Sequence, residues 1–290
     1  MSSLTGTPLE WIYSVFGVSN DVQLCTKMTN IGLVYTIIVG LYSLLFPAPY
    51  GRYASSSFGP TINPKIAWMI QECMAFFCPI MIIIMTAGLQ LENFANIVAI
   101  FLFTFHYFHR SFIYPFAMSS ESKPAPILVA LSAATFCVYN GLLQGIHLAN
   151  VHDVEDSFYV YLGTVVFMIG MAINITHDRM LIALRKKSSG GEGEAKSSSS
   201  ETEAKQRYKI PRGELFEYVS GANYLGEIIE WIALAFITRG YPQIIFALFS
   251  AVFLGIRALH HHRFYKNTFG SSYPQSRKAI IPFILRLSKR

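Results

Sequence analysis

The feature that most limits the fold of this chain is a series of long apolar runs separated by short polar links. Only 14% of its 290 residues are charged, whereas a soluble domain usually carries about 25%. A helix needs about 20 mainly apolar residues to cross a bilayer. Together with flanking residues, seven runs suit this role: Ile31–Phe46, Ile66–Leu89, Phe94–Phe116, Pro126–Leu148, Phe158–Leu184, Leu225–Ile237 and Pro242–His260. The sequence therefore predicts one all-α membrane domain over residues 1–290, a bundle of seven transmembrane helices.

The basic residues are distributed unevenly between the two sides of such a bundle. Seven crossings place 18 of the 23 Lys and Arg on the side of the C-terminus, and only Lys27 and Arg239 on the other side. Cytosolic links carry the excess of Lys and Arg, so we expect a cytosolic C-terminus. The net charge of +6 does not indicate nucleic acid, because the basic residues lie in links without an aromatic–basic platform.

One link differs from the others in composition. Lys186–Gln206 reads KKSSGGEGEAKSSSSETEAKQ, which has too few apolar residues to bury a core. We expect this segment to be a flexible cytosolic loop. Its glycines do not follow a strand, so they do not indicate a phosphate-binding loop.

Charged and hydrogen-bonding residues recur inside the apolar runs, where charge is costly and usually serves function. Several are spaced three, four, seven or eleven apart and so share one face of a helix. The groups are Gln71 and Glu72; His106 and Arg110 with Tyr107 and Tyr114 beside them; Asn174, Asp178 and Arg185; Asn223, Glu227 and Glu230; and Arg257, His261 and Tyr265. Polar contacts that merely join helices are the alternative. Because the set is large and carries both signs of charge, it predicts an internal polar cavity for a phosphate-bearing ligand.

The histidines and cysteines do not form a metal-binding pattern. His106 and His109, and the run His260–His262, resemble fragments of the histidine boxes of di-iron enzymes. Three consecutive histidines, however, point in three directions from a helix, and Glu227–Glu230 lacks the Glu-x-x-His pairing of di-iron bundles. None of the four cysteines forms a CxxC pair. We therefore expect no metal and no disulfide framework.

An ordered series of blocks resembles one family, the steroid 5-alpha-reductases, which are membrane 3-oxo-5-alpha-steroid 4-dehydrogenases. The resemblance extends from about Tyr50 to Phe283. The blocks are AWMIQE (67–72), FHYFHRSFIY (105–114), NGLLQG (140–145), GMAINITHD (170–178), YKIPRGELFEYVSGANYLGEIIEW (208–231), GIRALHHHRFY (255–265) and YPQSRKAIIPFI (273–284). Relatives typically have a shorter link in place of Lys186–Gln206, which is most simply an inert surface insertion.

The resemblance implies an endoplasmic reticulum oxidoreductase with seven membrane helices. Such an enzyme uses NADPH to reduce the C4–C5 double bond of a 3-oxo-Δ4 steroid such as testosterone or progesterone. It implies that Glu72 and Tyr107 contact the substrate carbonyl. The implied cofactor contacts are Asn174, Asp178, Arg185, Asn223, Arg257, His261 and Tyr265. Residues expected in the substrate pocket or directly behind it are Trp68, Gln71, Arg110, Tyr114 and Glu227.

Two other functions are compatible with the same pattern. A membrane enoyl-CoA or polyprenol reductase would use similar NADPH chemistry, but enoyl-CoA relatives typically carry a ubiquitin-like N-terminal domain, for which residues 1–30 are too few. A lipid transporter or lipid-binding membrane protein would use the polar cavity without a nicotinamide. Oxidation of NADPH that depends on a steroid enone would distinguish the three.

Overall fold

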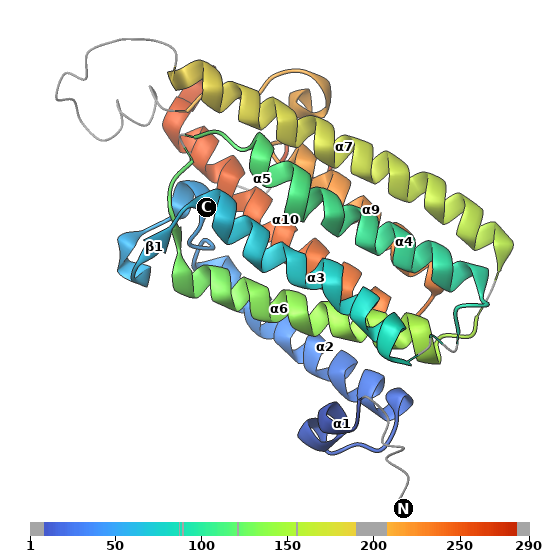
Figure 1. Cartoon of the computed structure of the whole chain (residues 1–290). Coiled ribbons are helices and arrows are strands. Elements are labelled where there is room, and N and C mark those ends of the chain that lie inside the picture. The colour runs from blue at the N-terminus through green and yellow to red at the C-terminus, as the bar shows by residue number, and fades with distance from the viewer. Residues whose placement is uncertain are drawn as a thin grey trace, which may run out of the picture.

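Each of the seven predicted apolar runs lies for most of its length in a helix, and these helices pack side by side in one bundle (Figure 1). The run Ile66–Leu89 is helical as far as Thr86, and the run Pro126–Leu148 begins with Pro126 in a short strand. The computed structural model describes residues 9–86, 88, 90–120, 122–154, 156–189 and 208–282. The long helices are α2 (Asp21–Leu45), α3 (Pro64–Thr86), α4 (Phe94–Phe108), α6 (Ile127–Ile146), α7 (Ser157–Ser189), α9 (Ala222–Thr238) and α10 (Tyr241–Phe269).

Shorter elements extend or join these helices. A π-helical turn at His109–Ile113 links α4 to α5 (Tyr114–Ala117), and a second at His147–Val151 extends α6. The two-residue strands β1 (Thr61–Ile62) and β2 (Ala125–Pro126) pair antiparallel. The remaining elements are α1 (Glu10–Phe16) and 3-10 turns at Gly51–Tyr53, Ser56–Phe58, Glu214–Glu217 and Gly270–Ser272.

Six spans in the described part of the chain are long and apolar enough to cross a membrane. They are Asp21–Leu45, Pro64–Thr86, Phe94–Ala117, Ile127–Val151, Ser157–Arg185 and Tyr241–Ser272. The one predicted span that is not among these six is Leu225–Ile237. It lies in α9, which has 17 residues and contains Glu227 and Glu230. Large apolar side chains on the outside of the bundle, such as Leu41, Ile84 and Phe116, are exposed, as expected of surfaces that face lipid.

Glycines allow two pairs of helices to approach until their backbones are in contact. A Cβ atom added to Gly226 of α9 would lie 2.5 Å from the backbone nitrogen of Asn174 in α7. A Cβ atom added to Gly141 of α6 would lie 2.9 Å from the Cβ of Cys78 in α3. Small residues serve this purpose in membrane bundles, where close packing replaces the hydrophobic effect as the force between helices. The α7–α9 and α3–α6 pairs therefore form the rigid walls of the bundle.

The helices exceed the predicted runs at several ends. The first run was predicted to begin at Ile31, but α2 begins at Asp21, where the Asn20 side chain accepts a 2.9 Å hydrogen bond from the backbone N–H of Gln23. This N-cap satisfies one of the free donors of the first turn, so a polar stretch starts the helix. The helix α7 extends beyond its predicted run at the C-terminal end and continues to Ser189. The first residues of the predicted loop Lys186–Gln206 are therefore helical. Residues 190–206 lie outside the described residues.

Candidate active site

All seven long helices contribute side chains to one internal cavity of about 720 Å³. Its wall includes thirteen of the fourteen predicted site residues: Trp68, Gln71, Glu72, Tyr107, Arg110, Tyr114, Asp178, Arg185, Asn223, Glu227, Arg257, His261 and Tyr265. The exception is Asn174, which is buried behind the wall. The polar faces inferred from helical spacing therefore do converge on one space.

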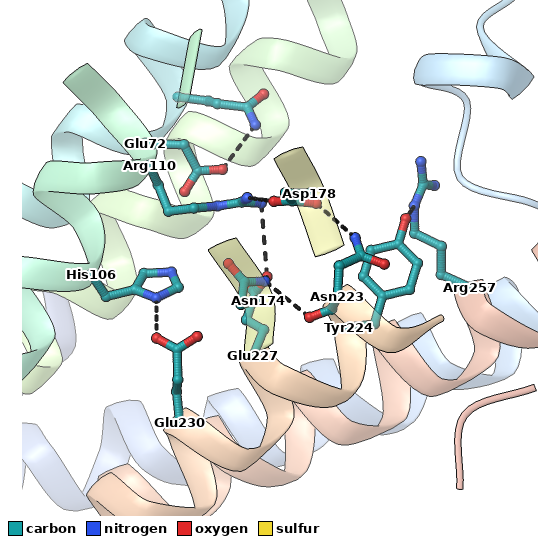
Figure 2. A network of polar contacts seen from close by, with 11 residues as sticks. Glu72, His106, Arg110, Asn174, Asp178, Asn223, Tyr224, Glu227, Glu230 and Arg257 are labelled. Atoms are coloured by element: carbon teal, nitrogen blue, oxygen red, sulfur yellow. Dashed lines mark hydrogen bonds and ion pairs between the residues drawn. The ribbon is translucent and has the colours of Figure 1, made fainter. Parts of the chain in front are cut away.

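Arg110 is at the centre of the polar network in this cavity. Its Nη1 donates a 2.8 Å hydrogen bond to Oδ2 of Asp178, and its Nη2 lies 3.8 Å from Oε2 of Glu227. Figure 2 shows Glu72 and Glu227 on opposite sides of the guanidinium. The π-helical turn that starts at His109 carries Arg110, and such turns often occur at functional sites. A buried charge needs partners of opposite sign, and here they come from α7 and α9.

Asp178 and Asn174 tie α7 to the first turns of α9. Asn223 donates a 2.9 Å hydrogen bond from Nδ2 to Oδ1 of Asp178, so both carboxylate oxygens of Asp178 accept a bond. Asn174 donates from its own Nδ2 to the backbone oxygen of Asn223 at 2.9 Å. Asn174 therefore holds Asn223 in place (Figure 2). Asn223 lines the cavity, whereas Asn174 does not.

Glu72 and Tyr107 lie where the wall changes from polar to aromatic. Oε1 of Glu72 accepts a 3.0 Å hydrogen bond from Nε2 of Gln71. The ring of Tyr107 stacks on Trp231 with a centroid distance of 5.8 Å and packs against Phe103 at 4.8 Å. Apolar and aromatic side chains continue the wall on α6 and α10, among them Phe136, Cys137, Phe246, Phe249 and Phe253. This half of the cavity suits a rigid apolar ligand with one polar end.

Arg257 binds the segment that connects α2 to α3, residues 46–63, at the edge of the cavity. Its Nε donates to the hydroxyl of Tyr224 at 3.0 Å, and its Nη1 and Nη2 donate to the backbone oxygens of Ala48 and Tyr50 at 3.4 Å each. The guanidinium carbon also lies 3.6 Å from the centre of the Tyr50 ring. Burial raises the pKa of the Tyr50 phenol to about 12, so this ring stays neutral and presents its face to the cation.

Arg52, on the same link, makes a second connection. Its Nη2 donates a 2.9 Å hydrogen bond to the hydroxyl of Tyr265, and its guanidinium carbon lies 4.5 Å and 4.6 Å from the ring centres of Phe264 and Tyr265. The backbone oxygen of Arg52 accepts a bond from Nζ of Lys123 at 3.1 Å. These contacts gather cations at one end of the cavity, the basic end, which comprises Arg52, Lys123, Arg185, Lys209 and Arg257.

The donors at this end fit an anionic ligand that carries phosphates. Nη1 of Arg52 and Nε1 of Trp68 are buried donors of cavity residues with no hydrogen-bond partner among the described residues. Nε2 of His261 is likewise buried and unpartnered there, and it donates or accepts according to the tautomer. Buried donors are normally paired. A guanidinium has five N–H donors, and the bonds of Arg257 use three of them. The cavity therefore offers unused donors beside several cations, which is the chemistry that phosphate groups require.

Sequence spacing missed several contributors to this site, among them Tyr50, Arg52 and Tyr224. Tyr50 and Arg52 lie in a link, which has no helical periodicity to reveal the direction of its side chains. Tyr224 follows Asn223 in the first turn of α9 and points toward Arg257 (Figure 2); its place in a helical run next to a predicted site residue was the only signal. Glu230 was grouped with Glu227 by spacing, but it lies outside the cavity wall and bonds His106 at 2.7 Å.

The histidines are dispersed over several polar contacts. Besides the His106–Glu230 pair, Nε2 of His260 bonds the backbone oxygen of Ser43 at 2.7 Å, and Nδ1 of His262 bonds the hydroxyl of Ser220 at 2.6 Å. Within the described ranges, no three His, Cys, Asp or Glu side chains are grouped so that they could hold a metal ion.

Comparisons with known proteins agree on one family. The family description "3-oxo-5-alpha-steroid 4-dehydrogenase" matches residues 123–285. The chain is 41% identical over 244 residues to 3-oxo-5-alpha-steroid 4-dehydrogenase 2 of Homo sapiens, covering 82% of this chain and 88% of that protein. It is 40% identical over 273 residues to the protein of the same name in Rattus norvegicus, covering 92% and 98% of the two chains. It is also 36% identical over 247 residues to steroid 5-alpha-reductase DET2 of Arabidopsis thaliana, covering 82% and 87%. An oxidoreductase family thus accounts for nearly the whole chain, which belongs to the 3-oxo-5-alpha-steroid 4-dehydrogenases.

Proposed function

We propose that this protein reduces the C4–C5 double bond of 3-oxo-Δ4 steroids, such as testosterone or progesterone, with NADPH as the reductant. The observation that carries the proposal is the cavity itself, in which a basic end with unused donors adjoins an aromatic half that contains Glu72 and Tyr107. A phosphate-bearing cofactor suits the first part and a flat apolar substrate suits the second. The names of the relatives favour a steroid.

The cofactor would be held by the basic end and the walls of α7, α9 and α10. Arg52, Arg185 and Arg257 would bind its phosphates, because guanidinium groups bind phosphate oxygens with two parallel hydrogen bonds. Asp178 and Asn223 present hydrogen-bonding groups to the same space, while Asn174 fixes Asn223 from behind. When bound, NADPH supplies a hydride to the substrate.

Glu72 and Tyr107 would stabilise the charge that develops on the substrate. A hydride added at C5 of a conjugated enone moves an electron pair to the oxygen at C3. Hydrogen-bond donors aimed at that oxygen lower the barrier, because they pair with charge that is absent from the ground state. The phenol of Tyr107 donates its O–H, and Glu72 donates in its protonated form. C4 then takes a proton, and the product is the 5α-reduced 3-oxo steroid.

The same proposal includes a position in the membrane. α9 would be a seventh span, enclosed by α7 and α10, which places the two ends of the chain on opposite sides. The basic end of the cavity would then face the cytosol together with the C-terminus, in accord with the excess of Lys and Arg on that side. The membrane would be that of the endoplasmic reticulum. A glycosylation reporter fused to the C-terminus should stay unglycosylated; a glycosylated reporter would exclude this orientation.

The activity is tested with purified protein in lipid nanodiscs. Oxidation of NADPH should depend on testosterone, and the steroid product should be the 5α-reduced ketone by mass spectrometry and chromatography. An enoyl-CoA thioester and a polyprenol, added in turn as substrates, should not support oxidation. Oxidation with either of these but not with the steroid would refute the proposal.

A further inference from the structure

Three other rings pack against the ring of Tyr107. Phe103 contacts it at a centroid distance of 4.8 Å, His106 at 5.2 Å with 76° between the planes, and Trp231 at 5.8 Å. His106 also packs on Trp231 at 4.5 Å, so these two rings contact each other as well as Tyr107. The tyrosine is 5% exposed, and its side-chain torsions determine where the hydroxyl lies. The neighbouring rings therefore restrict the position of the phenolic oxygen.

A buried carboxyl group holds the histidine of this cluster. Nδ1 of His106 lies 2.7 Å from Oε2 of Glu230 in α9, and the two side chains are 3% and 0% exposed. Figure 2 shows the bond between them. Neither residue belongs to the cavity wall, whereas Tyr107 and Trp231 do. The pair therefore lies behind the part of the wall that contains Tyr107.

Helix α7 fixes the side chain of Glu230 in turn. A Cβ atom added to Gly170 of α7 would lie 2.9 Å from the backbone nitrogen of Glu230 and 3.0 Å from its Cγ. Because Gly170 leaves this space free, α7 packs directly against the aliphatic part of the glutamate. The contacts thus run from α7 through Glu230 to His106, and from the imidazole ring to Tyr107 and Trp231.

The His106–Glu230 pair is a costly way to join α4 to α9. Oε1 of Glu230 is buried and makes no hydrogen bond to any other described residue, and an unpaired buried acceptor is unfavourable. A buried ion pair can often be replaced by apolar side chains without loss of stability. Stability alone therefore does not account for a carboxyl group and an imidazole behind Tyr107.

We propose that His106, oriented by Glu230, is a positioning residue that holds the phenol of Tyr107 where its hydroxyl meets the oxygen of the substrate. A donor stabilises a developing oxyanion most when it is already in position before the reaction. The bond to Glu230 fixes the rotation of the imidazole, and the imidazole limits movement of the Tyr107 and Trp231 rings. This inference rests on the proposed function, in which Tyr107 is the donor to the substrate carbonyl.

The alternative is that the pair only joins α4 to α9, as polar side chains commonly do in membrane bundles. His106→Asn separates the two roles, because the asparagine amide can take the place of Nδ1 and still bond Glu230, while the ring against Tyr107 is lost. If the pair only joins helices, kcat per folded molecule stays within about twofold of wild type. If His106 positions Tyr107, kcat falls about tenfold, or about 1.4 kcal/mol in the barrier, while KM for NADPH changes less than twofold.

Two variants of Glu230 test the bond while the imidazole ring is retained. Glutamine can still bond His106 through its amide, so Glu230→Gln should keep kcat within about twofold of wild type. Leucine cannot form this bond, and the unrestrained imidazole of Glu230→Leu should lower kcat several-fold. The comparison of these two variants also decides between the roles if His106→Asn does not fold.

His152 provides a matched control away from the cavity. It is 5% exposed, its Nδ1 lies 2.5 Å from Oδ1 of Asn96, and it is not part of the cavity wall. Its ring packs on that of His147 at 5.5 Å. His152→Asn therefore removes a comparable buried ring, and we expect it to lower the melting temperature while kcat per folded molecule stays within about twofold of wild type.

The experiment measures kcat, both Michaelis constants and melting temperature for wild type and these variants in lipid nanodiscs. It also measures binding of testosterone, and of its analogue that lacks the 3-oxo group, in the absence of cofactor. His106→Asn should weaken binding of the 3-oxo steroid several-fold and leave binding of the 3-deoxy analogue unchanged. In a Tyr107→Phe background, where the hydroxyl is already absent, His106→Asn should add no further loss of kcat.

The outcomes separate the positioning role from the proposed function. A wild-type protein that reduces no steroid enone would overturn the proposed function. If wild type reduces the enone and His106→Asn keeps both its kcat and its preference for the 3-oxo steroid, only the positioning role is overturned. Equal losses of kcat in His106→Asn and His152→Asn, or an undiminished loss in the Tyr107→Phe background, would also overturn that role, because the ring would then act on the bundle rather than on the hydroxyl.

Discussion

Replacing Arg257 by lysine keeps the positive charge but removes the planar set of donors, and it should weaken the use of NADPH. Arg257 uses three of its five N–H donors on Tyr224, Ala48 and Tyr50, which leaves two for a cofactor phosphate. A hydrogen bond to a charged group contributes about 1.5–3 kcal/mol. If lysine makes one such bond fewer to the phosphate, the Kd for NADPH rises about 10- to 150-fold.

The assay is NADPH binding by fluorescence, together with KM for NADPH at saturating steroid and steroid binding without cofactor. Arg257→Ala should be worse than Arg257→Lys, because it also removes the charge, and both should affect steroid binding less than NADPH binding. Arg239→Lys is the matched control, since Arg239 stacks on Tyr159 at 4.4 Å outside the cavity wall. Unchanged NADPH binding in Arg257→Lys would refute the role assigned to this donor set.

Three further results are expected. Glu72→Ala and Tyr107→Phe each remove a donor to the developing oxyanion and should lower kcat by about 10²- to 10³-fold, while NADPH binding persists; full activity in both would exclude their role. Gly226→Ala should destabilise the protein by about 1–3 kcal/mol, since a Cβ would lie 2.5 Å from a backbone nitrogen of α7, whereas Gly255→Ala, with open space around the new Cβ, should be neutral or stabilising in a thermal melt. A hydrogen bond from the backbone N–H of Gly213, and next the charges of Arg277 and Arg212, lower the pKa of Glu217 below its usual 4.5. The ionised Glu217 therefore stabilises the fold above pH 4.5, and this stabilisation is lost as the pH falls further. The melting temperature of the wild type should drop below pH 4.5, and that of Glu217→Gln should drop less.

The helices could be predicted because a segment that crosses lipid is rich in apolar residues, and each predicted apolar run is helical over most of its length. Their ends were less predictable, because polar residues start or continue a helix when a cap or good helix formers are present. Asn20 shows this for α2. α1 was not predicted, because seven residues flanked by polar ones give too short a pattern. The π-helical turn at His109–Ile113 was also not predicted.

The part of the site that lies on helices could be predicted from the spacing of its residues. Spacing identifies residues that share a face, and most of those faces do line the cavity. It does not reveal what lies in front of a face, which is why Asn174 proved to be covered by the backbone of α9: Gly226 allows that helix to approach it. Nor does spacing orient a link, so Tyr50 and Arg52 became visible only through their contacts with Arg257 and Tyr265.

The contact between Gly226 and α7 has a consequence for the synthesis of the protein. α9 carries Glu227 and Glu230 within 17 residues, so a translocon that sorts each segment by its own hydrophobicity would hold it back. In the proposed arrangement, in which α9 is a seventh span, its carboxylates become acceptable in the bilayer once Arg110 and His106 are present to pair with them. We therefore expect α9 to enter late, as a hairpin partner of α7, after α4 is already in place. Substitutions along the contact between α9 and α7 should lower the amount of folded protein in the membrane. They should change kcat and KM of the folded molecules less.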